Sequence, residues 1–205
     1  MHDKIITYLN DKYKPHTIMV YGSFADGSNN THSDYDALVI SDTIVEQHDG
    51  HIIDNIELDV FIYPTTTIEG LLDFSQFTKL YDSKIIKDER KIGFHLKERV
   101  IKYVEDNSIQ SYDKKKHLYG WCKKMLNRTQ RGDAEGYYRW HWLITDSLEV
   151  YCILRNKFYF GPKKTILQIE KIDKKGYELF LSAVTKLDYE NLKKWIYYVI
   201  GEFDE

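Results

Sequence analysis

The chain has 205 residues, of which 42% are hydrophobic and 15% aromatic, so it can bury a hydrophobic core without disulfides. Its formal net charge of −3 at pH 7 excludes the strongly basic footprint of a protein that binds a nucleic-acid backbone. No apolar run approaches the roughly 18 residues that a membrane-spanning helix needs, so no membrane partner is expected.

The first 90 residues alternate between helical and extended patterns. In chain order, the expected elements are a helix with Ile5, Ile6 and Leu9 on its apolar face, strands over residues 17–21 and 35–40, one or two strands over 52–63 broken at Asp54-Asn55 and closed by Pro64, and a short helix over 68–74. Hydroxyls of residues 65–67 are expected to cap that helix, and the residues up to Arg90 to lead out of the sheet. The pattern predicts an α/β or α+β domain over residues 1–90.

From about Lys91 the apolar residues follow a helical period. Stripes of this kind lie over residues 94–104, 117–126, 137–152, 177–184 and 192–199, and turn-forming residues separate them at 106–108, 131–133, 160–162 and 175–176. The pattern predicts an all-α helical bundle domain over residues 91–205.

Charge is divided unevenly between these two parts. Up to Arg90 there are 7 Lys and Arg against 16 Asp and Glu, a net charge of −9, and from Lys91 onward 22 against 16, a net charge of +6. An acidic first part could hold metal ions, and a basic second part could face an anionic substrate.

Two aspartates mark the start of the second expected strand. Asp34 and Asp36 are two residues apart, so on an extended chain both side chains leave the same face within reach of one ion. Neighbouring carboxylates repel each other, and a hard divalent cation such as Mg²⁺ neutralises them while it also binds phosphate oxygens. The pair predicts a magnesium site.

A glycine and a serine directly follow the first expected strand. Gly22-Ser23 can open a helix whose free N–H groups, with the Ser23 hydroxyl, hold phosphate oxygens, and Gly27 then permits a tight turn. The sequence therefore predicts a phosphate-binding segment one loop away from the metal site.

A third carboxylate is expected on a neighbouring strand, because two metal ions about 4 Å apart need a ligand from another direction. The stretch Ile56 to Tyr63 offers two candidates on one strand face. Asp59, which heads the more apolar part, is the first choice, and Glu57 is the alternative that the spacing leaves open.

Together these residues resemble a known family. Gly22-Ser23, ten intervening residues, Asp34-Tyr35-Asp36 and the later Asp59 are similar to the motif of the nucleotidyltransferase superfamily typified by DNA polymerase β, and within it to the small antibiotic nucleotidyltransferases. The resemblance implies a nucleotidyltransferase domain with a mixed sheet, followed by a helical bundle that closes over the nucleotide.

The resemblance also implies an activity. Mg²⁺ ions held by Asp34, Asp36 and Asp59 would activate a hydroxyl of an acceptor, which attacks the α-phosphorus of ATP and expels pyrophosphate. Such enzymes carry a lysine near the triphosphate in a segment similar to residues 156–164, which here points to Lys163 or Lys164. The expected acceptor is a small molecule such as an aminoglycoside or lincosamide antibiotic, and the enzyme would then confer antibiotic resistance.

An alternative keeps the chemistry and changes the acceptor. A toxin–antitoxin component would adenylylate a partner protein, although minimal antitoxin transferases usually lack a fused helical bundle.

Asp146 and Glu149, three residues apart on one expected helix, could contact amines of a small acceptor. Neither the nucleotide preference nor the oligomeric state is encoded in these motifs, so a homodimer is left open.

Cys122 and Cys152 lie far apart, without the CxxC or Cys/His spacing of a metal site. They are expected to be reduced thiols in a core, which favours a cytoplasmic protein.

Overall fold

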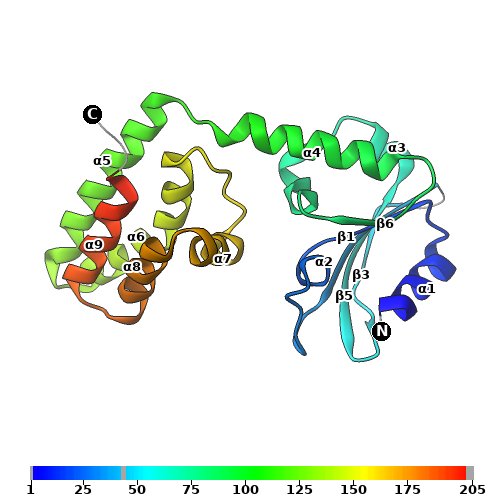
Figure 1. Ribbon diagram of the computed structural model, residues 1–205, viewed down its shortest axis with the longest axis horizontal. Helices are drawn as coiled ribbons and strands as arrows, with labels where there is room; N and C mark the ends of the chain where they lie inside the picture. Colours follow the sequence, from blue (N-terminus) through cyan, green and yellow to red (C-terminus); the bar gives the residue numbers. More distant parts are fainter. Residues whose placement is uncertain (1, 43–44, 202–205) are drawn as a thin grey trace. The chain divides into compact units, whose positions relative to one another are not determined.

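A computed structural model describes residues 2–42 and 45–201 and divides the chain into two compact units, Met1–Val104 and Glu105–Glu205. Figure 1 shows the helices and strands of each unit. The sequence predicts a boundary at residue 90, but α4 (Ile92–Ser108) packs on the sheet, and the first unit therefore extends to Val104.

The first unit is built on a mixed sheet. Its elements are α1 (His2–Tyr13), β1 (Thr17–Val20), α2 (Ser23–Asp26), β2 (Tyr35–Ser41), β3 (Gln47–Asp49), β4 (Ile52–Ile53), β5 (Ile56–Pro64), α3 (Thr65–Glu69), the 3₁₀ helix η1 (Phe74–Leu80), β6 (Lys84–Asp88) and α4. The strand order is β3-β5-β2-β1-β6, with β4 paired to β5, and β2 and β5 are parallel whereas the other pairs are antiparallel. The predicted fold class, an α/β domain followed by an all-α region, is confirmed.

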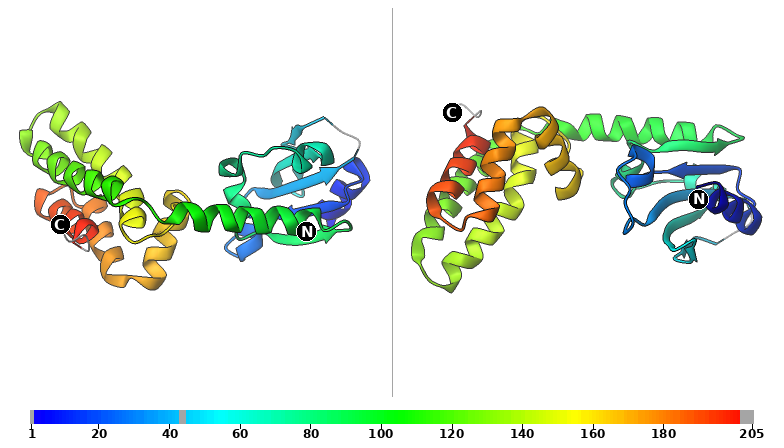
Figure 2. Two further views of the ribbon diagram at one scale, coloured as in Figure 1. Left: turned by 90° about the horizontal axis from the view of Figure 1, so that it is seen from above. Right: turned by 60° about the horizontal axis from the view of Figure 1, so that its bottom comes forward.

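Both faces of this sheet are covered, so its central strands β1 and β2 are buried on both sides. Helix α1 packs on one face, where Ile5 and Leu9 meet alternate residues of the central strands. Helix α4 and η1 cover the other face, where Leu96 and Leu80 pack against Leu38 and its neighbours. Figure 2 shows α4 running along the sheet. The long apolar runs of β1 and β2 follow from this double burial.

The structure corrects two predictions for residues 65–90. A helix does form after Pro64, but it covers residues 65–69 rather than 68–74, and residues 74–80 form the 3₁₀ helix η1. The segment before Arg90 does not leave the sheet, because β6 pairs antiparallel with β1 and forms an edge strand. Strand β6 has no fully buried residue, so its hydrophobic alternation is too weak to recognise in the sequence.

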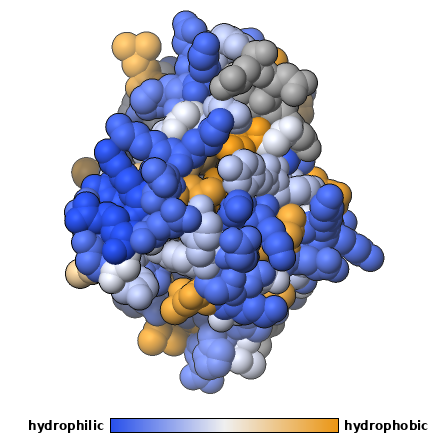
Figure 3. Space-filling model, turned by 90° about the vertical axis from the view of Figure 1, so that its left-hand side faces the viewer, coloured by the Kyte–Doolittle hydropathy of each residue, from blue (hydrophilic) through white to orange (hydrophobic). Residues whose placement is uncertain are grey.

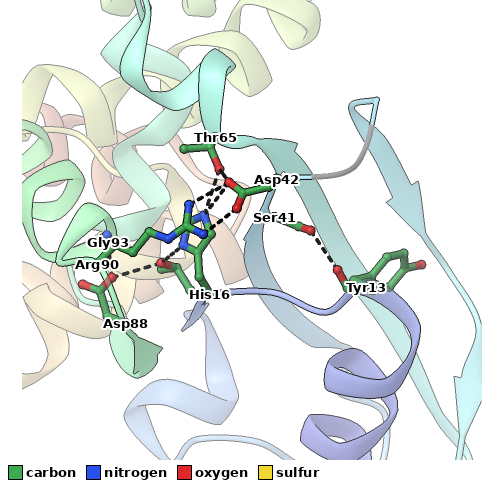
Figure 4. A network of polar contacts seen from close by, with 9 residues as sticks. Tyr13, His16, Ser41, Asp42, Thr65, Asp88, Arg90 and Gly93 are labelled. Carbon is green, nitrogen blue, oxygen red and sulfur yellow. Dashed lines mark hydrogen bonds and ion pairs between the residues drawn. The ribbon is translucent and has the colours of Figure 1, made fainter.

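The hydroxyl of Thr65 has a different role from the expected helix cap. It donates a hydrogen bond to Asp42 (2.7 Å) and pairs with Nε2 of the buried His16 (2.8 Å), as Figure 4 shows. Arg90 closes the network with a hydrogen bond to Asp42 of 2.8 Å. Burial lowers the pKa of His16, and the charge of Arg90 lowers it further. The network ties the connection before β1 to the ends of β2 and β6.

The second unit is an all-α bundle. Its helices are α5 (Tyr112–Arg128), the 3₁₀ helix η2 (Thr129–Arg131), α6 (Ala134–Leu154), α7 (Pro162–Ile172), α8 (Lys174–Thr185) and α9 (Tyr189–Ile200). The turns expected at 131–133 and 160–162 separate helices. Those expected at 106–108 and 175–176 lie inside α4 and α8, because the caps that begin the next helices are Ser111 and Asp173.

The core of the bundle surrounds Trp195, which is fully buried and donates a hydrogen bond to Ser147 (2.7 Å). Cys122 and Cys152 are both free and buried, as expected for reduced thiols in a core. On the face drawn in Figure 3, hydrophilic residues predominate and apolar residues form small separate groups. None of the helices in the described part of the chain combines the length and apolar character needed to cross a membrane.

Candidate active site

The parallel pairing of β2 and β5 brings carboxylates from two strands together. Asp36 and Asp59 are direct partners in the register of these strands, and Asp34 immediately precedes β2. One side-chain oxygen from each of the three residues lies within 4.8 Å of the others. Asp34 is exposed, and Asp36 and Asp59 are partly buried. Three oxygen donors from two directions form a ligand set that Mg²⁺ prefers.

The register also separates the two candidates for the third carboxylate. Asp59 faces Asp36 across the strand pair, whereas Glu57 lies two residues earlier, where β5 pairs with β4. Glu57 is exposed and is not part of the three-carboxylate group. The structure therefore places Asp59, rather than Glu57, with Asp34 and Asp36.

The backbone at Gly22 is shaped around Asp36. Gly22 has φ 64° and ψ −152°, a conformation that only glycine adopts readily. A Cβ atom at this position would lie 2.1 Å from Oδ2 of Asp36. The N–H of the preceding Tyr21 donates to the main-chain oxygen of Asp36 (3.1 Å). The glycine thus lets the loop after β1 pass directly against a candidate metal ligand.

A helix begins after Gly22, as the sequence predicts. The N–H groups of Ala25 and Asp26 bond to the oxygen of Gly22 at 3.1 and 3.2 Å, which closes the first turn of α2. Ser23 is 6% exposed and is the first residue of this helix. Ser23 therefore lies one residue from the glycine that contacts Asp36, and a phosphate group there would be next to the carboxylates.

No sequence pattern indicated a histidine at this site. Nε2 of His48, in β3, lies 2.7 Å from Oδ1 of Asp59, and the His48 ring packs on Phe61 with 4.9 Å between ring centroids. His48 and Phe61 are register partners on β3 and β5. The contact holds one oxygen of Asp59 and leaves its second oxygen for another ligand. Only the pairing of β3 with β5 reveals this neighbour.

Two lysines predicted to bind the triphosphate belong to the second unit. Lys163 and Lys164 lie in the first turn of α7, which begins with Pro162 after Gly161. Nζ of Lys164 lies 5.1 Å from the centre of the Phe160 ring. A role for either lysine at the nucleotide stays a prediction.

The second unit has a pocket of its own, with a volume of about 210 Å³. Asp146 and Glu149, which the sequence offers as contacts for an amine, line it together with Trp121 and Lys114. Asp146 accepts a hydrogen bond from Nε1 of Trp142 (2.6 Å). The pocket thus combines aromatic, acidic and basic groups.

Comparison with known proteins concerns mainly the first unit. Residues 3–58 match a family model described as Polymerase beta, Nucleotidyltransferase. The matched segment contains Gly22, Ser23, Asp34 and Asp36, and it ends one residue before Asp59. The match is therefore to a nucleotidyltransferase family model and is confined to the first unit.

One solved structure resembles the whole chain more distantly. The crystal structure of a nucleotidyltransferase-like protein from Exiguobacterium sibiricum 255-15 is 12% identical to this chain, with a TM-score of 0.39, over 98% of this chain and 71% of that chain. No curated protein matches the sequence.

Proposed function

We propose that the chain is a nucleotidyltransferase that moves AMP from ATP to a hydroxyl group of a small acceptor molecule. The observation that carries this proposal is the grouping of Asp34, Asp36 and Asp59 within 4.8 Å, next to the Gly22-Ser23 turn. The family match over residues 3–58 supports nucleotidyl transfer as the type of reaction.

Asp34, Asp36 and Asp59 would hold Mg²⁺. Their donor set fits that ion, because all three ligands are carboxylate oxygens. When bound, Mg²⁺ neutralises phosphate charge and lowers the pKa of a bound hydroxyl.

Residues of the chain would orient the nucleotide and accept the proton. The hydroxyl and N–H of Ser23 would orient the phosphates of the nucleotide. The acceptor oxygen forms a bond to the α-phosphorus while the bond to the β-phosphate oxygen breaks, and pyrophosphate leaves. Asp59 would accept the proton of the attacking hydroxyl, while His48 holds its Oδ1 in place. Asp59 would thus act in the chemical step, and Ser23 in binding.

We further propose an amine-bearing acceptor of the aminoglycoside or lincosamide type. The net charge of −9 over residues 1–90 would attract a polycation by long-range electrostatics. The pocket lined by Asp146, Glu149 and Trp121 supports the same class, because carboxylates and an aromatic face both bind ammonium groups.

The experiment is transfer of label from α-³²P-ATP in the presence of Mg²⁺, with a panel of antibiotics and, separately, with cell lysate. We expect label on a small molecule, and its loss by about 10³-fold or more in Asp36→Asn, which removes a ligand charge. Asp11→Asn is the matched control, because Asp11 is exposed on α1. Label on a protein band would favour the protein-modifying alternative, and equal transfer by Asp36→Asn would contradict the proposed site.

A further inference from the structure

Lys79, in η1, packs against the strand that carries Asp59 but is not paired with the carboxylates. Its Nζ is 3.7 Å from the centre of the Phe61 ring and 5.0 Å from that of Tyr21, so two aromatic rings hold the ammonium group. Phe61 follows Asp59 by two residues on β5, and Tyr21 directly precedes Gly22. The two rings that contact Lys79 therefore lie on the strand that carries Asp59 and on the segment that leads into Gly22-Ser23.

Asp59 and Asp36 are the charged groups that act on Lys79. Burial lowers the pKa of Lys79, and the negative charges of Asp59 and Asp36 act in the opposite direction. Among residues 2–42 and 45–201, no hydrogen bond or ion pair to Nζ is found. Nζ of Lys79 is not enclosed by the protein, so its three N–H donors face solvent and are available to a ligand.

The hydroxyl of Tyr21 is a second polar group at this site that a ligand could bind. Tyr21 is 4% exposed, and in the described part of the chain its hydroxyl has no hydrogen-bond partner. Tyr21 adjoins the same carboxylates, because its N–H donates to the main-chain oxygen of Asp36 (3.1 Å) and the next residue is Gly22. Buried polar groups without partners are rare in folded proteins, and they point to a bound group or water.

An anion fits Lys79 better than a cation does. Three carboxylates and a nucleoside triphosphate carry about seven negative charges, of which two Mg²⁺ ions would neutralise about four. A nearby ammonium group reduces the remaining repulsion. Aromatic rings, and not Asp59, hold Lys79 in place. The carboxylate oxygens therefore stay available to a metal ion, and the N–H donors of Lys79 stay available to a ligand.

We propose that Lys79 binds the phosphates of the nucleotide, as a cation that Phe61 and Tyr21 hold beside Asp36 and Asp59. This inference rests on the proposed function, and it adds a phosphate-binding residue from η1 to the expected Ser23. Lysine side chains bind phosphate as point charges with three donors.

The test compares Lys79→Met, which keeps the length and apolar stem of the side chain, with Lys79→Arg, which keeps the charge. Calorimetry measures binding of Mg²⁺ alone, of Mg²⁺ with tripolyphosphate, and of Mg²⁺ with a non-hydrolysable ATP analogue. The control is Lys124→Met, because Lys124 is exposed on α5 in the second unit.

We expect Lys79→Met to weaken the binding of both phosphate compounds by about tenfold, since it removes a charge-assisted contact. Binding of Mg²⁺ alone should be unchanged or tighter, because a positive charge near the metal site is removed. Lys79→Arg should stay within about threefold of wild type, and Lys124→Met should be unchanged.

Two results would overturn this inference without touching the proposed function. One is phosphate binding by Lys79→Met as tight as in wild type. The other is a loss of Mg²⁺ and phosphate binding together with a lower melting temperature, which would show that Lys79 only supports the fold. If the wild-type protein bound none of the three probes, the proposed function would fail as well.

Discussion

At the scale of single residues, the candidate active site depends on close contacts between side chains and backbone. Gly22 leaves room for the Asp36 carboxylate, and Asp36 in turn lies beside Asp59 across the strand pair. Carboxylates at this spacing repel one another, so the backbone must hold them in place. Changes of one or two atoms at these positions should therefore alter metal and nucleotide binding more than they alter the fold.

Replacement of Gly22 by alanine should abolish metal binding. The new Cβ would lie 2.1 Å from Oδ2 of Asp36, so this carboxylate must move, and φ of 64° adds backbone strain. Gly27→Ala is the matched control, because Gly27 also has a positive φ of 82° but a Cβ there meets no atom within 4 Å.

The measurement for this pair is Mg²⁺ affinity by calorimetry, together with thermal unfolding. Gly27→Ala should lose only about 1–2 kcal/mol of stability and keep its metal affinity. Equal Mg²⁺ affinity in Gly22→Ala and wild type would show that the Asp36 contact is unimportant.

Asp59 and Glu57 should differ in the step that they affect. Asp59→Asn should still bind MgATP through Asp34, Asp36 and Ser23 but fail in transfer, because Asp59 acts on the acceptor hydroxyl. Glu57→Gln should transfer at nearly the wild-type rate, because Glu57 is exposed and lies outside the carboxylate group.

Single-turnover transfer and nucleotide affinity, measured for both variants, separate these roles. If Glu57→Gln lost transfer and Asp59→Asn kept it, the third carboxylate would be Glu57.

At the scale of secondary-structure elements, a buried carboxylate joins α1 to β3. The side chain of Asp49 is fully buried and accepts hydrogen bonds from Tyr13 (2.6 Å) and Tyr8 (3.0 Å), and Lys12 lies 3.1 Å away. The N–H of His51 donates a further bond of 3.0 Å. Burial alone would raise the pKa of Asp49, but these donors outweigh it and hold the pKa well below its usual range. The charge of Asp49 therefore stabilises the docking of α1 on the sheet.

Asp49→Asn should destabilise the first unit by about 2–3 kcal/mol at neutral pH, since it removes a charged acceptor from buried donors. The folded-state pKa of Asp49 is lower than the unfolded value of about 3.9, so its contribution is complete above about pH 4 and is lost as the pH falls further.

Urea unfolding of Asp49→Asn and wild type between pH 7 and pH 2.5, followed by circular dichroism, measures this difference. The gap between the two proteins should shrink below about pH 4. A gap that stayed constant down to pH 2.5 would mean that the Asp49 charge does not contribute.

At the scale of the whole molecule, the two units have separate hydrophobic cores. The sheet cores contain residues up to Val100, and the bundle core begins at Cys122. All four tryptophans, Trp121, Trp140, Trp142 and Trp195, belong to the second unit. Tryptophan fluorescence therefore reports unfolding of the bundle, while circular dichroism reports both units.

We expect the units to unfold independently. Leu38→Ala, in the sheet core, should cost the first unit about 2–5 kcal/mol and shift part of the circular dichroism transition, but leave the fluorescence transition in place. Leu192→Ala is the matched variant in the bundle core and should shift the fluorescence transition. If Leu38→Ala shifted both signals equally, the chain would unfold as one cooperative system.

The sequence by itself determined the features that depend on neighbours along the chain. Short apolar runs indicated β1 and β2, and the apolar stretch broken at Asp54-Asn55 indicated the paired strands on either side of it. Both of these residues have positive φ in a tight turn. The change of period indicated the helical second part. The pairing of Asp34 with Asp36 also follows from local geometry, since residues two apart share a strand face.

Only the tertiary structure decided which distant residues lie beside Asp34 and Asp36. Asp59 and Glu57 share one strand face, and the parallel register of β2 with β5 alone places Asp59 beside Asp36. His48 reaches Asp59 through the pairing of β3 with β5, and Lys79 lies there because η1 packs on the same sheet face. Register and packing depend on the burial of both sheet faces at once, and no local sequence pattern encodes this combined requirement.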